Sequence, residues 1–167
     1  MERLIPLLEP YLSLSLSTTT TTTTTTDPQF VDIGSGDGRV CVTVSKHFTC
    51  HSLGIDVTDL CTNRAKQLSV EEKTSHLTTF LTLDATALKL DSDECGPLKC
   101  ARIVYLFVFP SLLKEIKKIL KEVMSVNEGL RVVTQNYHFE DDEGEIEAEV
   151  EVEDDGFKGL KIWKRLY

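Results

Sequence analysis

Short apolar runs alternate with amphipathic stretches along most of the chain. The apolar runs are rich in β-branched and aromatic residues, as buried strands are; we expect strands at residues 30–33, 53–56, 79–84, 103–109 and 130–137. Apolar side chains recur every three or four positions between these runs, which predicts helices at residues 37–48, 58–70 and 111–124. In the second of these helices Leu60, Arg64 and Leu68 repeat every four residues. Alternating strands and helices predict an α/β fold with a parallel sheet covered on both faces.

The N-terminal part of the chain departs from this alternation. Residues 2–12 favour a short helix interrupted near Pro10, and we assign residues 1–13 to it. Residues 14–28 contain nine consecutive threonines and predict a low-complexity linker, since a uniform run has no buried face to fix a strand register. One globular domain then follows over residues 29–167.

The C-terminal part alternates charged and apolar residues over 145–153 and again over 160–166. This pattern predicts an antiparallel hairpin with one face in water. The net charge of -9 is concentrated here, because residues 140–155 contain eleven acids and no base. The remaining chain shows no basic stripe, so no nucleic-acid partner is expected. The acidic run is interpreted as a solvated hairpin edge, or alternatively as a surface that attracts a basic protein tail.

The cysteines and the hydropathy favour a reduced intracellular compartment, and we expect a cytoplasmic protein. The five cysteines are odd in number and include no C-x-x-C pair. No apolar run reaches the roughly 18 residues of a membrane span, and the N-terminus is a poor targeting signal. His47, Cys50 and His51 lie close in sequence, but a fourth ligand is missing and no metal site is expected.

The segment FVDIGSGDGR at residues 30–39 places three glycines directly after the first expected strand. Gly34, Gly36 and Gly38 allow a tight turn and let a ligand touch the backbone, while free N–H groups at the next helix favour a negative group. The nicotinamide fingerprint G-x-G-x-x-G requires its third glycine where this chain has Arg39. A nicotinamide-dependent oxidoreductase is therefore disfavoured.

Three acids accompany this turn. Asp32, Asp56 and Asp84 lie at the ends of successive strands, which meet at one edge of a parallel sheet. Asp56 is placed to accept hydrogen bonds from the ribose hydroxyls of an adenosine. The alternatives are a helix cap for Asp56 and a turn cap for Asp84.

VDIGSGDGR resembles motif I of the class I S-adenosylmethionine-dependent methyltransferases. The acid two residues before the first glycine agrees with that motif, and so do Ser35 and Asp37. The resemblance implies S-adenosylmethionine as the cofactor, with Asp32 near its ammonium group and Asp84 near its adenine. The implied cofactor-binding residues are Asp32, Gly34, Ser35, Gly36, Asp37, Gly38, Asp56 and Asp84.

The resemblance extends over residues 29–167 and is closest to a small subgroup with the motif D-x-G-S-G-D-G-R. The segments that carry it are GIDVTDLCTNRAKQ, IVYLFVFPSLLKEIKKIL, GLRVVTQNYHF and LKIWKRLY. The subgroup includes bacterial methyltransferase-domain proteins and lysine methyltransferases acting on mitochondrial inner-membrane proteins. It implies a Rossmann-like sheet of seven strands ending in the hairpin, a protein substrate that is methylated at lysine, and a mitochondrial location as the alternative to a cytoplasmic one.

The acceptor side is less well defined by the sequence. The N-x-P-P-Y/F motif of enzymes that methylate nucleobase amino groups is absent, and Tyr105, Phe107, Phe109 and Pro110 stand in its place. We interpret these mostly as core residues that could otherwise line an acceptor slot, and Tyr105 is the candidate catalytic residue that takes a proton from a lysine.

Two further features bear on the acceptor. Asn136, Tyr137 and His138 follow the fifth strand on the ligand side of the sheet and could touch a substrate. The subgroup's substrate-gripping segment before motif I has no equivalent among residues 1–28. A non-catalytic S-adenosylmethionine-binding or protein-interaction module is therefore the alternative function.

Overall fold

The computed structural model describes residues 3–13, 27–139, 146–154 and 157–166 of the 167-residue chain. It contains a seven-stranded sheet in the order β3-β2-β1-β4-β5-β7-β6. The strands are β1 (Phe30–Ile33), β2 (Ser52–Asp56), β3 (Thr78–Thr82), β4 (Ile103–Leu106), β5 (Arg131–Gln135), β6 (Ile146–Asp154) and β7 (Phe157–Arg165). Strands β1 to β5 are parallel, whereas β7 is antiparallel to both β5 and β6. The predicted mostly parallel, Rossmann-like sheet with a C-terminal hairpin is confirmed.

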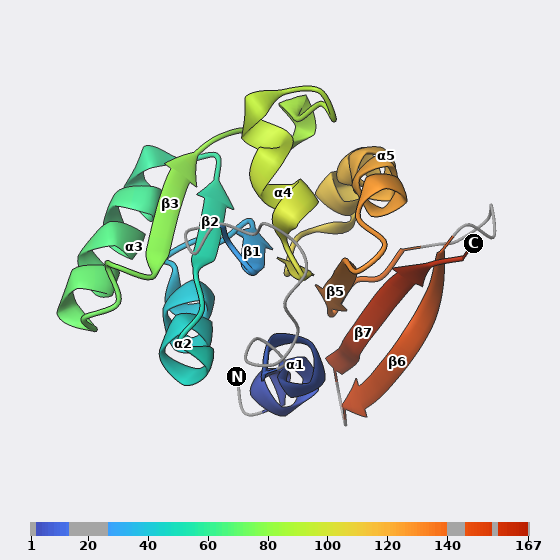
Figure 1. Cartoon of the computed structure of the whole chain (residues 1–167), viewed down its shortest axis with the longest axis horizontal. Helices are drawn as coiled ribbons and strands as arrows, with labels where there is room; N and C mark the ends of the chain where they lie inside the picture. The colour runs from blue at the N-terminus through green and yellow to red at the C-terminus, as the bar shows by residue number, and fades with distance from the viewer. Residues whose placement is uncertain (1–2, 14–26, 140–145, 155–156, 167) are drawn as a thin grey trace.

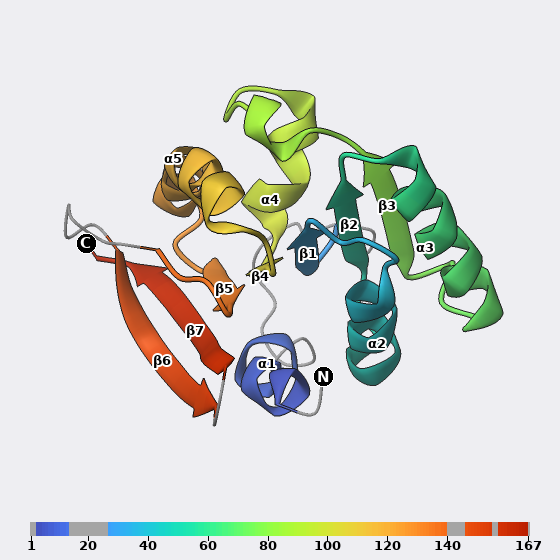
Figure 2. The same cartoon turned by 180° about the vertical axis from the view of Figure 1, so that it is seen from behind.

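Helices cover both faces of the sheet (Figures 1 and 2). They are α1 (Leu4–Leu12), α2 (Arg39–Phe48), α3 (Asp59–Glu71), α4 (Gly96–Cys100) and α5 (Pro110–Val126), with short 3-10 turns η2 (Ala85–Ala87) and η3 (Asp93–Cys95). The core side chains form two clusters, one on each face of the sheet. Strand β1 contributes Val31 and Ile33 to the cluster beneath α4 and α5, and Phe30 to the cluster beneath α1 and α2.

Helix α1 is packed into the second of these clusters. Leu4, Leu8 and Leu12 are buried, and their spacing of four residues makes a single apolar stripe. The helix continues through Pro10 to Leu12, so the interruption that we expected near Pro10 does not occur. The buried stripe compensates for the hydrogen bond that proline cannot donate. The threonine run at residues 18–26 lies outside the described residues.

Helix α3 buries mainly small residues on the side that faces the sheet. Leu60 is 82% exposed, and the buried side chains are the small residues Thr62, Ala65 and Ser69. The hydroxyl of Thr62 lies 2.7 Å from that of Thr82 in β3, so hydroxyl groups satisfy each other beneath the helix. Of the repeated residues Leu60, Arg64 and Leu68, only Leu68 packs against the core, and small residues on the buried side let the helix approach the sheet closely.

One ion pair ties the C-terminal hairpin to β5 and another joins the two strands of the hairpin. Arg131 Nε lies 2.7 Å from Glu149 Oε2, and Lys164 Nζ lies 2.8 Å from Glu147 Oε1. Two acids of the acidic run are thus engaged in ion pairs, Glu147 within the hairpin and Glu149 with β5. Residues 140–145 and 155 of that run lie outside the described residues.

Candidate functional site

The glycine turn, residues 34–38, lies where the strand order of the sheet reverses. Strands β2 and β4 flank β1 on opposite sides, so their carboxyl ends diverge around the turn. A Cβ atom added to Gly34 would lie 2.7 Å from Cγ1 of Val108, just beyond β4. The absence of a side chain at Gly34 therefore lets the chain leaving β4 approach the turn.

The backbone of the turn is held in a left-handed conformation and leaves one open position. The N–H groups of Gly34 and Ser35 donate to the Ile55 carbonyl at 2.8 and 3.0 Å. Gly36 has φ +54°, and a Cβ added there would meet no atom within 4 Å. Gly38 has φ +77°, and a Cβ there would lie 2.6 Å from Ala65. Gly36 is thus where a ligand can reach the backbone, whereas Gly38 serves the packing of α3.

Asp56 joins the glycine turn to the end of β2. Its Oδ2 accepts the Gly36 N–H at 3.0 Å, and its Oδ1 accepts the N–H and hydroxyl of Thr58 at 3.0 and 2.8 Å. The side chain therefore caps the turn before α3 and also supports Gly36, whereas the N-cap residue of α3 is Thr58 rather than Asp56. A carboxylate offers about four lone-pair sites, so it retains capacity for a ligand hydroxyl.

Asp32 is buried within the sheet beneath the turn. In register with it stand Gly54 of β2 and Tyr105 of β4, and the Cys41 thiol lies 4.0 Å from its Oδ2. Burial raises the pKa of the Asp32 carboxyl from 3.8 to about 8, and the negative charge of Asp56 adds to this. A buried acid with so little compensation is a natural partner for a cationic ligand group.

Of the other three predicted cofactor residues, Asp37 and Asp84 have local hydrogen-bond partners and the Ser35 side chain does not. Asp37 accepts hydrogen bonds from the Arg39 guanidinium, which lowers the pKa of the Asp37 carboxyl. Asp84 accepts the N–H and hydroxyl of Thr86 at 2.9 and 2.7 Å and so caps η2. The buried Ser35 hydroxyl has no hydrogen-bond partner among the described residues.

The chain that leaves β4 presents aromatic rings to solvent. Phe107 is 52% exposed and Phe109 is 75% exposed, so interpreting them as core residues was wrong. Strand β4 ends at Leu106, and the run to residue 109 is therefore not one buried strand. The Phe109 and Tyr137 rings lie 6.4 Å apart between centroids, which joins the chain beyond β4 to that beyond β5. We call Phe107, Phe109 and Tyr137 the aromatic lip.

Tyr105 is buried, and its hydroxyl donates a hydrogen bond to Oε1 of Gln135. Burial, with the charge of Asp32, raises the pKa of the Tyr105 hydroxyl. A phenol that holds its proton so firmly is a poor general base, which argues against the role expected for Tyr105. Gln135 was missed by the sequence reasoning, although a polar residue that ends an apolar strand at the ligand edge was a usable signal.

The residues after β5 turn sharply. Asn136 has φ +66°, and its N–H donates to the Gly159 carbonyl at 3.1 Å. His138 Nδ1 lies 2.8 Å from the Thr134 hydroxyl, which also accepts from the Trp163 indole. Asn136 and His138 thus support the loop, and Tyr137 alone of the three contributes to the aromatic lip.

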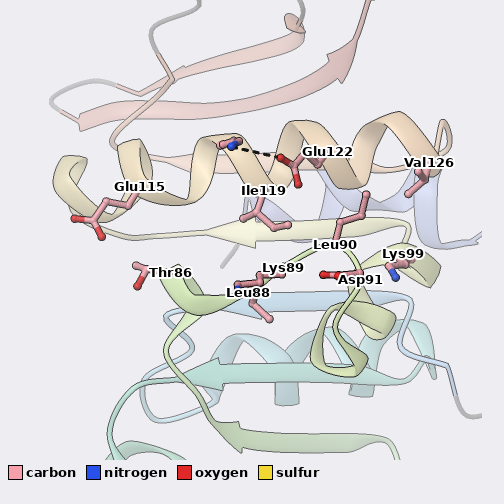
Figure 3. Close-up of a pocket in the computed structure, with 11 residues that line it drawn as sticks. Thr86, Leu88, Lys89, Leu90, Asp91, Lys99, Glu115, Ile119, Glu122 and Val126 are labelled. Atoms are coloured by element: carbon pink, nitrogen blue, oxygen red, sulfur yellow. Dashed lines mark ion pairs between the residues drawn. The ribbon is translucent and has the colours of Figure 1, made fainter.

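Other features of the described residues lie away from this turn. A groove of about 640 Å³ runs between the segment after η2 and α5 (Figure 3). On the α5 side of this groove, Lys118 Nζ lies 3.9 Å from Glu122 Oε1. Within the described part of the chain, no three potential ligand side chains gather to hold a metal ion. No helix there has the length and hydropathy of a membrane span. All five cysteines are free thiols.

Comparison with known families gives one match. The sequence model of the family described as "Histone methylation protein DOT1" matches residues 9–94, slightly more than half of the chain. No curated protein matches the chain.

Solved structures of similar fold are numerous. An RNA methyltransferase from Salinibacter ruber in complex with S-adenosylhomocysteine has a TM-score of 0.68 and 20% identity, covering 96% of this chain and 90% of that one. The ribosomal protein L11 methylase from Lactobacillus delbrueckii subsp. bulgaricus has a TM-score of 0.64 and 14% identity, with coverages of 84% and 71%. A methyltransferase from Thiobacillus denitrificans, also with S-adenosylhomocysteine, has a TM-score of 0.54 and 15% identity, with coverages of 80% and 48%.

These likenesses concern the fold. The chain has the class I S-adenosylmethionine-dependent methyltransferase fold, and several of the similar structures contain S-adenosylhomocysteine, consistent with S-adenosylmethionine as the cofactor. The chain spans less than half the length of several of these similar structures. Their acceptors include RNA and a ribosomal protein, so the fold does not select the acceptor.

Proposed function

The chain belongs to the family of the histone methylation protein DOT1, and we propose that it is an S-adenosylmethionine-dependent methyltransferase acting on a protein. The acceptor group that we propose is a lysine side chain, which the resemblance to the D-x-G-S-G-D-G-R subgroup supports. The observation that carries the proposal is the accessible backbone of Gly36, which lies where the strand order reverses. Asp56 holds this backbone in place by accepting the Gly36 N–H.

The residues at the glycine turn fit this cofactor. Gly36 leaves room for the amino-acid end, the remaining lone pair on Oδ2 of Asp56 suits a ribose hydroxyl, and the buried acid Asp32 suits a cationic group. The bound cofactor supplies a methyl group already activated on a sulfonium. The protein's contribution is then to orient the nucleophile and exclude water from the cleft.

The aromatic lip supports a protein acceptor. Phe107 and Phe109 expose their rings beside the turn, where the proline-rich motif of nucleobase amino methylation is absent. Exposed aromatic faces attract the ammonium group and the aliphatic stem of a lysine. A stacked nucleobase is the competing occupant, and the experiment below distinguishes the two.

Calorimetry followed by labelling tests the proposal. S-adenosylmethionine should bind and NAD should not, and Asp56→Ala should weaken the binding. Incubation with methyl-labelled cofactor and separate protein and RNA fractions of a cell extract should then label protein. Label confined to RNA would overturn the protein acceptor, while NAD binding without a response to S-adenosylmethionine would overturn the whole proposal.

The alternative is a non-catalytic module that binds S-adenosylmethionine. One observation favours it: Tyr105, the candidate base, is hydrogen-bonded to Gln135 and keeps its proton. A lysine that loses its proton to water does not need a base in the cleft, so this observation does not exclude transfer. Binding of the cofactor without a labelled product in either the protein or the RNA fraction would support the non-catalytic module.

A further inference from the structure

We propose that Gln135, held by the Tyr105 hydroxyl, is a positioning residue that orients the acceptor amine in the cleft. This inference rests on the proposed methyl transfer to a protein. It assigns a role to the polar side chain at the carboxyl end of β5, which cofactor binding does not explain.

The contact between Tyr105 and Gln135 is directed along the sheet rather than straight across it. The residue in register with Tyr105 is Val133, yet the Tyr105 hydroxyl reaches Gln135, two residues closer to the carboxyl edge. The Tyr105 ring therefore leans toward the edge at which the glycine turn lies. A buried phenol thus donates its single proton to an amide at the rim of the cleft.

This hydrogen bond fixes the orientation of the Gln135 amide. Its Oε1 has two lone pairs, and the Tyr105 hydroxyl occupies one of them. Burial and the neighbouring charge of Asp32 raise the pKa of the phenol, so it remains a donor across the physiological pH range. The second lone pair of Oε1 remains for another donor.

The backbone directly after Gln135 leads to the aromatic lip. The left-handed Asn136 reverses the chain, and the Tyr137 N–H donates back to the Gln135 carbonyl at 2.8 Å. Tyr137 then meets Phe109 with ring centroids 6.4 Å apart. Gln135, which is half-buried, therefore lies at the base of the lip, between the buried Tyr105 and the exposed aromatic rings.

An amide oxygen in this place suits a neutral amine. By accepting one N–H of the amine, Oε1 directs the nitrogen lone pair elsewhere and leaves it available for attack. That lone pair forms the new N–CH3 bond as the S–CH3 bond breaks. The electron pair of the broken bond stays on sulfur, which gives the thioether S-adenosylhomocysteine, and the surplus proton on nitrogen leaves to water. An uncharged oxygen also avoids the ion pair by which a carboxylate would hold the amine in its unreactive ammonium form.

Three variants and one control test the inference. Gln135→Ala, Gln135→Glu and Tyr105→Phe are compared with Gln67→Ala, an exposed glutamine on α3. Each is measured for S-adenosylhomocysteine affinity by calorimetry, for melting temperature, and for the rate of labelling of poly-L-lysine and of an extract's protein fraction between pH 6.5 and 9.5.

Gln135→Ala should keep the S-adenosylhomocysteine affinity within about twofold and lose at least about tenfold in labelling rate, as expected for one lost orienting hydrogen bond. Tyr105→Phe should also lower the labelling rate, by a smaller factor than Gln135→Ala. Gln135→Glu should retain the contact with Tyr105 but move the half-maximal rate to higher pH, since its charge favours the ammonium form of the acceptor.

Two results would overturn the role of Gln135 while leaving the proposed function intact. One is a Gln135→Ala variant that labels protein as fast as Gln67→Ala does. The other is a fall in labelling that merely parallels a loss of S-adenosylhomocysteine affinity. A wild-type protein that binds the cofactor and labels no protein would instead overturn the proposed methyl transfer to protein, and this inference with it.

Discussion

Replacing Asp32 by asparagine should stabilise the cofactor-free protein at alkaline pH. Asp32 is 2% exposed, and the nearest polar contact described for it is the weak one with the Cys41 thiol at 4.0 Å. Its pKa of about 8, against an ordinary value of 3.8, arises first from burial and second from the charge of Asp56. Ionising this group in the folded protein is therefore unfavourable, and asparagine fills the same space without ionising.

The pH dependence follows from the direction in which the pKa of Asp32 moves. Below pH 3.8 the carboxyl is protonated in both the folded and the unfolded chain, so it does not affect the equilibrium. Between pH 3.8 and 8 the unfolded chain loses this proton while the folded chain keeps it, and stability falls as pH rises. The free energy of unfolding falls by about 1.36 kcal/mol for each pH unit in this interval, so the loss reaches at most about 6 kcal/mol above pH 8. Relaxation of the site reduces it, so a gain of about 2–4 kcal/mol for Asp32→Asn at pH 9 is the working expectation.

Urea unfolding of the cofactor-free protein at pH 4, 7 and 9 measures this difference. The gap between Asp32→Asn and wild type should widen from pH 4 to about pH 8 and then level off. Asp37→Asn is the matched control, with an effect of opposite sign. Arg39 lowers the pKa of the Asp37 carboxyl, so the ionised Asp37 stabilises the folded protein above its unfolded pKa. The Asp37→Asn variant should therefore be slightly less stable than wild type at pH 7. A gap between Asp32→Asn and wild type that is constant across this range would refute the reasoning.

Three further predictions concern the turn, its support and helix α1. Asp56→Ala should weaken S-adenosylmethionine binding by about one to three kcal/mol in a calorimetric titration, and an unchanged affinity would remove Asp56 from the site. Gly36→Ala should lower cofactor affinity more than stability, whereas Gly38→Ala should mainly lower the melting temperature because its Cβ would meet Ala65 at 2.6 Å; equal effects of the two would contradict this division. Leu8→Ala should lower the free energy of unfolding by about 2–5 kcal/mol, and an unchanged urea midpoint would show that α1 is not part of the core.

The sequence was a good guide where a feature is set by neighbours in the chain. The glycine turn and the strand before it follow from local patterns, because a left-handed backbone requires glycine and a buried strand is continuously apolar. The buried side of α3 could not be read this way. Its Thr62 is buried because Thr82, in a distant strand, satisfies its hydroxyl, and no local pattern records that pairing.

The acceptor side was harder for a different reason. Phe107 and Phe109 continue the apolar run of β4, so the sequence pattern alone does not show where the strand ends. Only the end of the pairing at Leu106 leaves these rings exposed. Gln135 could not be recognised in the same way, because the apolar pattern predicts a strand that continues to Tyr137, whereas β5 ends at Gln135.

The acid beneath the turn and the amide at the acceptor side belong to one connected arrangement. Asp32 and Tyr105 are in register on adjacent strands, and Tyr105 in turn reaches Gln135. When a cationic cofactor group favours the ionised form of Asp32, the same negative charge raises the pKa of Tyr105 and keeps its proton in place. An ionised Asp32 thus reinforces the burial that already keeps the proton on Tyr105, the donor that holds Gln135. The cost of burying Asp32 is consistent with such a role, because an apolar residue in its place would stabilise the fold but would remove the charge from both sides.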